Sequence, residues 1–316
     1  MPQDSWPRIA VVGAGAVGCY FGGMLARAGA PVTLIGRQHH VDAINRNGLL
    51  IESTKFQQHI PVSATTDINA VSSAGFVMFC VKTLDTEIVA KEIEPHLAPN
   101  AVVLSMQNGV DNVDRIRSLT KLNPVATVVY VAAAMAGPGH VKHSARGDLA
   151  IANARDTKID IPGIAAMFER GGIPCRISEN IEVELWSKLA MNCGYNAISA
   201  LSQAKYGRVL HTPSTREVLK QAIVETVAVA NAAGVPLAEA TVVEAGLKLG
   251  EVMAEATSST AQDLARGKRT EIDSLNGYVF RRGEELGVAT PVNQALHALV
   301  QLLEEHAAPG TGSGRE

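Results

Sequence analysis

Residues 8–18, RIAVVGAGAVG, decide the fold of the first half of the chain. A short apolar run leads directly into a GxGxxG sequence, and a helical pattern follows it. Gly13 permits a tight turn, Gly15 lets the backbone approach a phosphate with no Cβ in the way, and Gly18 lets the helix pack closely on the strand. In this strand–turn–helix setting the spacing predicts that the segment binds the pyrophosphate of a dinucleotide. An ordinary Gly-rich turn is the alternative interpretation.

The first helical turn after these glycines completes the predicted phosphate site. Backbone N–H groups at a helix N-terminus lack partners within the helix and carry a partial positive charge, so they favour an anion. We therefore add Ala16 and Val17 to the glycines as predicted cofactor-binding residues.

Strand-like and helical patterns alternate through the rest of the first half. The expected strands are residues 8–12, 32–35, 76–81, 101–104 and 125–131, and the helical patterns between them include 17–28 and 85–96. This alternation predicts an α/β domain of the Rossmann type, with a doubly wound parallel sheet. After it come a Gly-rich stretch at 136–148, a strand at 149–152, a helix at 162–170 and a strand at 173–177.

The pattern changes near residue 178, where helical spacing replaces the alternation. Helices are expected over residues 180–203, 215–233, 237–257 and 270–286. We therefore expect a dinucleotide-binding Rossmann domain at 1–177, an all-helical substrate and catalytic domain at 178–308 and a disordered tail at 309–316.

The composition excludes several classes of protein. The 316 residues are 47% hydrophobic and 19% charged, and the net charge of −3 lacks the basic excess that nucleic acids or anionic membranes attract. No segment resembles a secretory leader or has the ~18 continuous apolar residues of a spanning helix. The four cysteines are scattered without metal-ligand spacing, which is typical of free thiols in a reducing compartment. We expect a cytoplasmic enzyme or binding protein that holds no metal; the sequence leaves open whether it forms a homodimer.

The end of the second expected strand indicates which dinucleotide binds. A fold that prefers NAD usually carries an acidic residue here for the ribose hydroxyls, but this chain has GRQHH at 36–40. Arg37 can pair with a 2′-phosphate, so NADPH is the predicted cofactor. The alternative is that Arg37 is a solvated loop residue. We expect His39 and His40 to be exposed loop histidines, and assistance to Arg37 is the alternative for them.

Two further polar residues follow strands at the edge where ligands bind in open α/β sheets. Lys82 follows the third strand in FCVKT, and Asn108 follows the next in LSMQNG. We predict that both side chains face the cofactor, and Asn108 offers both a donor and an acceptor. A surface lysine and a plain Asn-Gly turn are the alternatives.

The second half opens on a helix with a polar stripe. Lys188, Asn192 and Asn196 are spaced i, i+4, i+8, and such positions drift by only about 40° per step around a helix. The residues between them are mainly apolar, so the helix is expected to be buried. Because a buried polar group without a partner costs about 1–3 kcal/mol, the stripe predicts a polar site. A lysine paired with a carboxylate is the alternative.

An acidic cluster lies further along, in TEIDSLNG at 270–277. Glu271 and Asp273 are placed at an expected helix start, where Thr270 can serve as the cap. Capping accounts for one of these acids but not for the whole cluster.

Together these segments resemble the ketopantoate reductase (2-dehydropantoate 2-reductase) family. The matching pieces, in the family's order, are GAGAVG at 13–18, CVKT at 80–83, QNG at 107–109, WSKLAMNCGYN at 186–196, TSSTAQD at 257–263 and TEIDSLNG at 270–277. They cover nearly the whole chain, and the last three are more specific than the glycine fingerprint.

The resemblance implies a reaction and roles for individual residues. The reaction is the NADPH-dependent reduction of a 2-keto acid, 2-dehydropantoate to pantoate in pantothenate synthesis, with NADPH in a cleft between the two domains. Lys188 is implied to be the catalytic acid and Glu271 a catalytic residue that contacts the substrate. The positions that match substrate-site residues of the family are Asn108, Asn192, Asn196 and Ser259.

Two other classes remain as alternatives. β-Hydroxyacid dehydrogenases also have a lysine followed four residues later by an asparagine, but a Gly-rich lead-in usually precedes that lysine, whereas Glu-Leu-Trp-Ser precedes Lys188. An NADPH-binding sensor without turnover is the other class, and an intact Lys188 and Glu271 weigh against it.

Overall fold

A computed structural model of the chain describes residues 6–153 and 159–307. Internal contacts divide the chain into two compact units, and the boundary along the chain lies between Ile181 and Glu182. The sequence places its domain boundary at 177/178. The predicted tail at 309–316 lies outside the described residues.

The first unit is built on a parallel sheet with strand order β5-β2-β1-β6-β7-β8. These strands are β1 (Ile9–Val12), β2 (Val32–Ile35), β5 (Ser63–Thr65), β6 (Phe76–Phe79), β7 (Val102–Ser105) and β8 (Val125–Gly137). The direction of winding reverses between β1 and β6, and this reversal places the ligand-binding crevice of such sheets at the carboxyl ends of the two strands.

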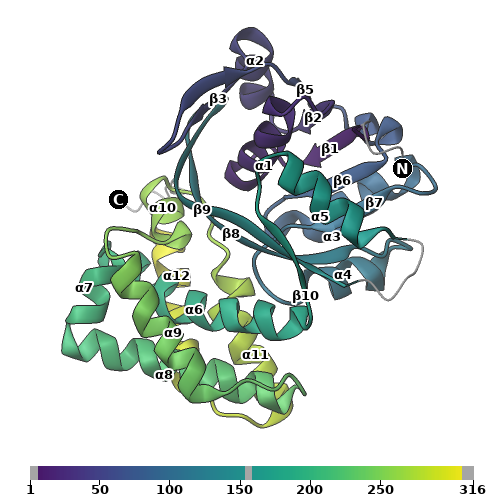
Figure 1. Cartoon of the computed structure of the whole chain (residues 1–316). Helices are drawn as coiled ribbons and strands as arrows, with labels where there is room; N and C mark the ends of the chain where they lie inside the picture. The colour runs from purple at the N-terminus through teal and green to yellow at the C-terminus, as the bar shows by residue number, and fades with distance from the viewer. Residues whose placement is uncertain (1–5, 154–158, 308–316) are drawn as a thin grey trace, which may run out of the picture. The chain divides into compact units, whose positions relative to one another are not determined.

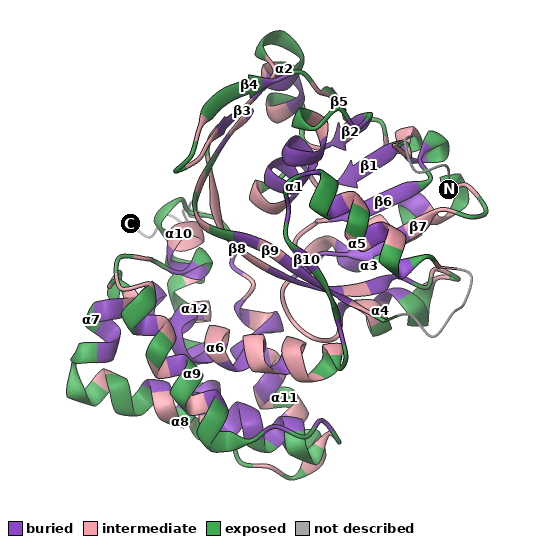
Figure 2. Ribbon diagram, viewed as in Figure 1, coloured by how far each residue is buried: buried purple, intermediate pink, exposed green. Residues whose placement is uncertain are grey.

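Alternate side chains of β1 enter hydrophobic cores on opposite faces of this sheet. Ile9 and Val11 belong to one core cluster and Ala10 and Val12 to another, as period-2 geometry requires. Helices cover both clusters, and Figure 2 shows the central strands as buried. The covering helices are α1 (Ala16–Arg27) and α5 (Ile161–Arg170) on one face and α3 (Thr86–Ile93) and α4 (Asn112–Leu119) on the other. The predicted doubly wound α/β fold is confirmed.

The Gly-rich stretch at 136–148 is largely β-strand and does not interrupt the sheet. β8 pairs antiparallel with β9 (His140–Ala152) in a long hairpin that extends the sheet (Figure 1). Gly139 takes up a positive φ in the turn, and Gly147, with φ +124°, lies beside Arg146 at an irregular point of the pairing. The glycines here mark a turn and a bulge, which are places where a strand requires unusual backbone angles.

Several smaller elements were absent from the expectation. These are α2 (Gln38–Asn47), β3 (Leu49–Glu52), β4 (Gln57–Ile60), β5, and the 3-10 turns η1 (Ile68–Ser73) and η2 (Thr83–Asp85). The helix expected over 85–96 is α3 followed by the 3-10 turn η3 (Glu94–His96), and the strand expected at 173–177 is β10 (Cys175–Ser178). The sequence pattern did not reveal helix α2, because the helix is mostly polar and buries only Val41 and Ile44 of its ten residues. Two apolar positions give a weak 3.6-residue periodicity.

Helices form every described element from 182 to 307. They are α6 (Ile181–Ser202), α7 (Tyr206–His211), α8 (Pro213–Ala232), α9 (Glu239–Val252), α10 (Ser259–Ala265), η4 (Ile272–Ser274), α11 (Asn276–Leu286) and α12 (Pro291–Ala307). The predicted helical domain is therefore confirmed, but the expected single helix over 270–286 is wrong. Its first turn is the 3-10 turn η4, and the non-helical backbone of Leu275 separates it from α11.

A chain of buried amides ties these helices together. Asn276 Nδ2, at the start of α11, donates to the Cys193 carbonyl of α6 at 3.0 Å and to Asn293 Oδ1 of α12 at 2.9 Å. Asn293 Nδ2 donates in turn to the Glu225 carboxylate of α8 at 2.8 Å. The same carboxylate accepts the backbone N–H groups of Val292 and Asn293 and so caps α12.

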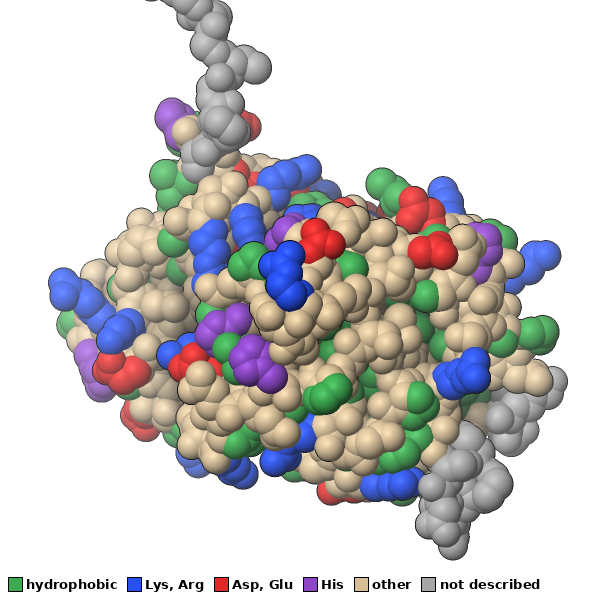
Figure 3. All heavy atoms as spheres, turned by 90° about the horizontal axis from the view of Figure 1, so that it is seen from above, with side chains coloured by type: hydrophobic (Ala, Val, Ile, Leu, Met, Phe, Trp, Pro, Cys, Tyr) green, Lys and Arg blue, Asp and Glu red, His purple; other side chains and the backbone are tan. Residues whose placement is uncertain are grey.

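No helix among the described residues is long and apolar enough to cross a membrane. On the face shown in Figure 3, basic, acidic and histidine side chains are interspersed with uncharged and apolar ones, which agrees with the small net charge of −3.

Glu225 provides a direct test of this network. Glu225→Gln keeps the shape of the side chain but places an amide N–H₂ group against the N–H donors of Val292 and Asn293. We therefore expect the free energy of unfolding to fall by about 1.5–3 kcal/mol. Glu217→Gln is the matched control, because Glu217 lies on the same helix, is exposed and pairs with the surface residue Lys220. Urea unfolding followed by circular dichroism measures both variants. Equal stability of the two variants would contradict the capping role.

Candidate active site

The turn between β1 and α1 is specified by the space around its glycines. Gly13 has φ +107°, and a Cβ on it would lie 2.7 Å from the backbone carbon of Cys80. A Cβ on Gly18 would collide with the Gly13 carbonyl and lie 2.8 Å from Val11 Cγ1. Both positions therefore require glycine, because α1 is pressed against the ends of β1 and β6.

Gly15 is different, because nothing lies within 4 Å of the position that its Cβ would occupy. It is exposed and extended, and α1 begins at the next residue without a side-chain cap and without an acidic residue in its first turn. Ala16 and Val17 in that turn are half-buried. Open space before uncapped helix amides fits a phosphate group.

Arg37 lies next to this turn. A Cβ on Gly36 would be 2.5 Å from the Ala14 side chain, so the residues that follow β2 pack on the glycine turn. Arg37 is exposed and is the N-cap residue of α2, whose first turn contains no acidic residue. The nearest acid along the helix, Asp42, accepts a hydrogen bond from Gln38 at 2.6 Å.

His39 and His40 are helical residues of α2, so the expectation of loop histidines is wrong. Their rings are 4.2 Å apart, and His39 is exposed whereas His40 is half-buried. His40 Nδ1 accepts the backbone N–H of Gly139 at 3.3 Å. His40 thus connects α2 to the turn of the β8–β9 hairpin, which gives it a structural contact.

The loops after β6 and β7 bring Lys82 and Asn108 to one edge of the sheet. Thr83, next to Lys82, donates its hydroxyl to the Asn108 carbonyl at 3.3 Å. The same carbonyl accepts Asn112 Nδ2 at 2.6 Å. Lys82 and Asn108 are both half-buried, and their placement at the carboxyl ends of neighbouring strands is the one that the sequence predicts.

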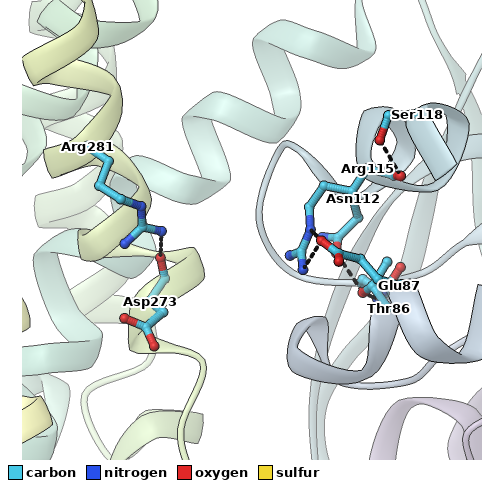
Figure 4. Close-up of polar contacts among 8 residues, drawn as sticks. Thr86, Glu87, Asn112, Arg115, Ser118, Asp273 and Arg281 are labelled. Carbon is cyan, nitrogen blue, oxygen red and sulfur yellow. Dashed lines mark hydrogen bonds and ion pairs between the residues drawn. The ribbon is translucent and has the colours of Figure 1, made fainter.

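A buried polar network that the sequence analysis missed holds these two loops. Gln107 Nε2 donates to the Val81 carbonyl at 3.2 Å and to Thr86 Oγ1 at 2.6 Å, and Thr86 donates to Asn112 Oδ1 at 3.1 Å. Figure 4 shows the Thr86–Asn112 bond beside the exposed Arg115–Glu87 ion pair that joins α3 and α4. The signal available in the sequence was a glutamine immediately before Asn108, at the end of a buried strand.

In the second unit the predicted polar stripe lies along α6. Lys188 and Asn192 are half-buried, and only Asn196 is buried, so the stripe is less enclosed than its apolar neighbours suggested. Asn196 Oδ1 accepts the Tyr206 hydroxyl at 3.4 Å. Tyr206 stacks on Tyr195 with ring centroids 4.4 Å apart, and burial raises the pKa of the Tyr206 hydroxyl, so it stays a donor.

The start of α10 is attached to the same part of α6. Ser258 caps α10 by accepting the Ala261 N–H, and its hydroxyl donates to the Asn196 carbonyl at 3.1 Å. Ser259, the predicted site residue, follows as the exposed first residue of α10. The fold therefore brings Ser259 close to Asn196, whereas Ser258, which makes the attachment, was not predicted.

Glu271 is the N-cap residue of η4 and is half-buried. Thr270 Oγ1 accepts the Ile272 N–H at 3.1 Å, so Thr270 caps this turn as expected, and the Glu271 side chain makes no cap bond to the backbone. The capping explanation therefore applies to Thr270 and not to Glu271.

The thiols take no part in this arrangement. Burial raises the pKa of Cys19 and of Cys193 to about 12, and it also raises the pKa of Cys80. All four cysteines are unpaired, and the described parts of the chain hold no cluster of three His, Cys, Asp or Glu side chains suited to a metal ion.

Comparison with known proteins places these features in a family. Residues 9–156 match the model of ketopantoate reductase PanE/ApbA, and residues 180–304 match the model of its C-terminal part. A 2-dehydropantoate 2-reductase of Halobacterium salinarum is 33% identical over 304 residues, covering 94% of this chain and 99% of that relative. The chain belongs to the ketopantoate reductase family. The expected family is thereby confirmed, and the chain is an oxidoreductase.

Solved structures of this family and its relatives share the fold. A PanE/ApbA family ketopantoate reductase from Ralstonia eutropha JMP134 has a TM-score of 0.89 and 48% identity, covering 95% of this chain and 99% of that one. A D-mandelate dehydrogenase, solved with NADH and anilino(oxo)acetate, also has a TM-score of 0.89, with 25% identity over 95% of this chain and 99% of that one. Ketopantoate reductases and a dehydrogenase of a different 2-hydroxy acid thus share this architecture.

The open space at Gly15 gives a test of the phosphate site. In Gly15→Val the new Cβ has no protein atom within 4 Å, so we expect a stable fold, but the side chain enters the space predicted for the pyrophosphate. Dinucleotide affinity, measured by calorimetry, should fall at least about tenfold, a change of ~1.4 kcal/mol. The matched control is Gly75→Val, since Gly75 is also exposed, has a negative φ and has open space at its Cβ position. A folded Gly15→Val protein with parental affinity would mean that the turn has only a structural role.

Proposed function

We propose that this chain is an NADPH-dependent 2-keto acid reductase that converts 2-dehydropantoate to pantoate, a step of pantothenate synthesis. The observation that carries the proposal is the match of both halves of the chain to the ketopantoate reductase models, with Lys188, Asn192 and Asn196 on one helix of the C-terminal half. The uncapped start of α1 next to the open position at Gly15 supports dinucleotide binding, and Arg37 supports a 2′-phosphate.

The chemistry assigned to Lys188 follows from the charge that develops during reduction. When bound, the nicotinamide supplies a hydride to the carbonyl carbon. The carbonyl oxygen gains negative charge, which the Lys188 ammonium stabilises. Lys188 then transfers a proton to this oxygen, the product is the 2-hydroxy acid, and the neutral amine takes up a proton from solvent.

The other predicted residues bind the substrate. Amide and hydroxyl donors at Asn192, Asn196 and Ser259 can hold the carboxylate of a 2-keto acid without a second cation. The Tyr206 hydroxyl is bonded to Asn196 Oδ1, and this supports an orientation in which the Asn196 N–H₂ group donates. Glu271 accepts a hydrogen bond from a hydroxyl of the substrate or orients Lys188. Lys82 and Asn108 are assigned to the cofactor, and Asn108 also to the substrate.

The similarity to D-mandelate dehydrogenase supports a second candidate, the reduction of an aryl 2-keto acid. That relative has the same TM-score as the Ralstonia eutropha reductase but a lower identity, 25% against 48%. NADPH oxidation with 2-dehydropantoate and with the 2-keto acid that corresponds to mandelate distinguishes the two. A higher kcat/KM for 2-dehydropantoate is expected.

The cofactor preference is tested at Arg37. A charge-assisted contact to the 2′-phosphate is worth ~1.5–3 kcal/mol, so Arg37→Ala should weaken NADPH about tenfold or more and leave NADH nearly unchanged. Arg46→Ala is the control, because Arg46 is an exposed arginine in the last turn of the same helix. Isothermal titration with both cofactors measures the effect. Equal affinities of the parental protein for NADPH and NADH would contradict the assignment.

The catalytic role of Lys188 is tested by substitution. Because general acid catalysis contributes about 10²–10⁴-fold, Lys188→Ala should lower kcat by that factor while NADPH affinity changes little. Lys188→Arg should restore little activity, since a guanidinium keeps its proton and has another shape. The alkaline limb of the pH–rate profile should disappear in Lys188→Ala. Turnover close to the parental value in this variant would show that the polar stripe of α6 is structural.

A further inference from the structure

Helix α12 carries a second polar stripe, which the proposed reaction does not use. His297, Gln301 and Glu304 are spaced i, i+4, i+7 and therefore lie on one face of the helix. His297 is only 9% exposed, although it is an ionisable residue in a small helical unit. Its surroundings need an explanation, because a nearly buried polar side chain must find partners.

All three side chains bond the short segment that carries Glu271. His297 Nε2 lies 2.7 Å from Asp273 Oδ1, and Gln301 Nε2 donates to the same oxygen at 2.9 Å. Glu304 Oε1 accepts the backbone N–H of Thr270 at 2.6 Å. The residue before Glu271 and the residue two places after it are thus both fixed to α12.

A further contact holds Asp273 from the side of α11. Arg281 donates to the Asp273 carbonyl at 2.7 Å (Figure 4), and the Ser274 N–H donates to the Glu271 carbonyl at 2.9 Å. The backbone of the Glu271 segment therefore has bonds on both sides of the glutamate. These bonds fix the backbone position from which the Glu271 side chain extends.

We propose that His297 and Gln301 are positioning residues for Glu271: by holding the Asp273 carboxylate, they fix the turn from which the Glu271 side chain reaches the substrate. This inference rests on the proposed function, in which Glu271 binds the 2-keto acid. A group that acts only through Glu271 should change substrate binding more than the chemical step, which belongs to Lys188.

Matched substitutions on α12 test the proposal. His297→Leu removes the donor to Asp273, and we expect KM for the keto acid to rise about tenfold, the effect of losing one charge-assisted bond, with a much smaller change in kcat. His297→Gln places an N–H donor near the position of Nε2 and should restore most of the parental KM. His306→Leu is the control, since His306 is exposed on the same helix and its ring bonds the Leu302 carbonyl one turn earlier, away from the Glu271 segment.

A second pair of variants tests the proposal even if His297→Leu does not fold. Gln301→Ala should raise KM in the same direction, whereas Gln294→Ala, at an exposed glutamine of α12, should leave KM at the parental value. Circular dichroism checks that each variant is folded. Parental KM values in both His297→Leu and Gln301→Ala would overturn the proposal.

A double-mutant cycle separates positioning from independent effects. If His297 acts through Glu271, His297→Leu should raise KM in the parental protein but not in a Glu271→Ala background. If His297→Leu instead raised KM by the same factor in the parental protein and in the Glu271→Ala background, the proposal would be overturned, even if each substitution alone raised KM. This outcome leaves the proposed reductase activity intact, because it is measured on an active enzyme.

Hydrogen exchange gives a readout that needs no activity. The Ile272 and Ser274 amides should exchange faster in His297→Leu than in His306→Leu, because the turn that they belong to loses its attachment. Unchanged exchange at both amides would overturn the positioning role. Faster exchange in a chain that reduces no 2-keto acid would instead support the attachment and contradict the proposed function.

Discussion

The close approach of α1 to the ends of β1 and β6 is the constraint on which the first unit depends. It exists only because Gly13 and Gly18 have no Cβ, since any side chain at either place would enter the backbone of the turn or the neighbouring strand. Helix α1 begins directly after Gly15, the one glycine of the three with open space at its Cβ position. One steric requirement thus accounts for the packing of the helix and for the open turn at which we propose that a phosphate binds.

In the helical unit, buried polar contacts join the helices in addition to their apolar packing. Asn276 and Asn293 connect α6, α11 and α12 to the buried Glu225 carboxylate, and Asn276 lies only five residues after Glu271. Ser258 attaches α10 to α6 at Asn196. The predicted substrate residues therefore lie on segments whose ends are fixed by buried hydrogen bonds, which is a suitable arrangement for residues that must keep their orientation.

The sequence predicted the features that follow from local pattern and steric rules. The central strands, the glycine turn and the placement of Lys82 and Asn108 at one edge of the sheet all follow from strand alternation. The β8–β9 hairpin at 125–152 did not, because its glycines resemble a loop until their partners in the other strand are known. The contacts of His297 with Asp273 join residues 24 positions apart, and no local pattern encodes such a pairing.

The central claim is that the chain reduces 2-dehydropantoate by hydride transfer. The most direct measurement is the mass of the product formed from 2-dehydropantoate and NADPH that carries deuterium at the transferable position of the nicotinamide ring. The account predicts pantoate that is heavier by one deuterium at C2, formed in equal amount to the NADPH oxidised. NADPH that remains unoxidised in the presence of 2-dehydropantoate, or pantoate without the label, would contradict it.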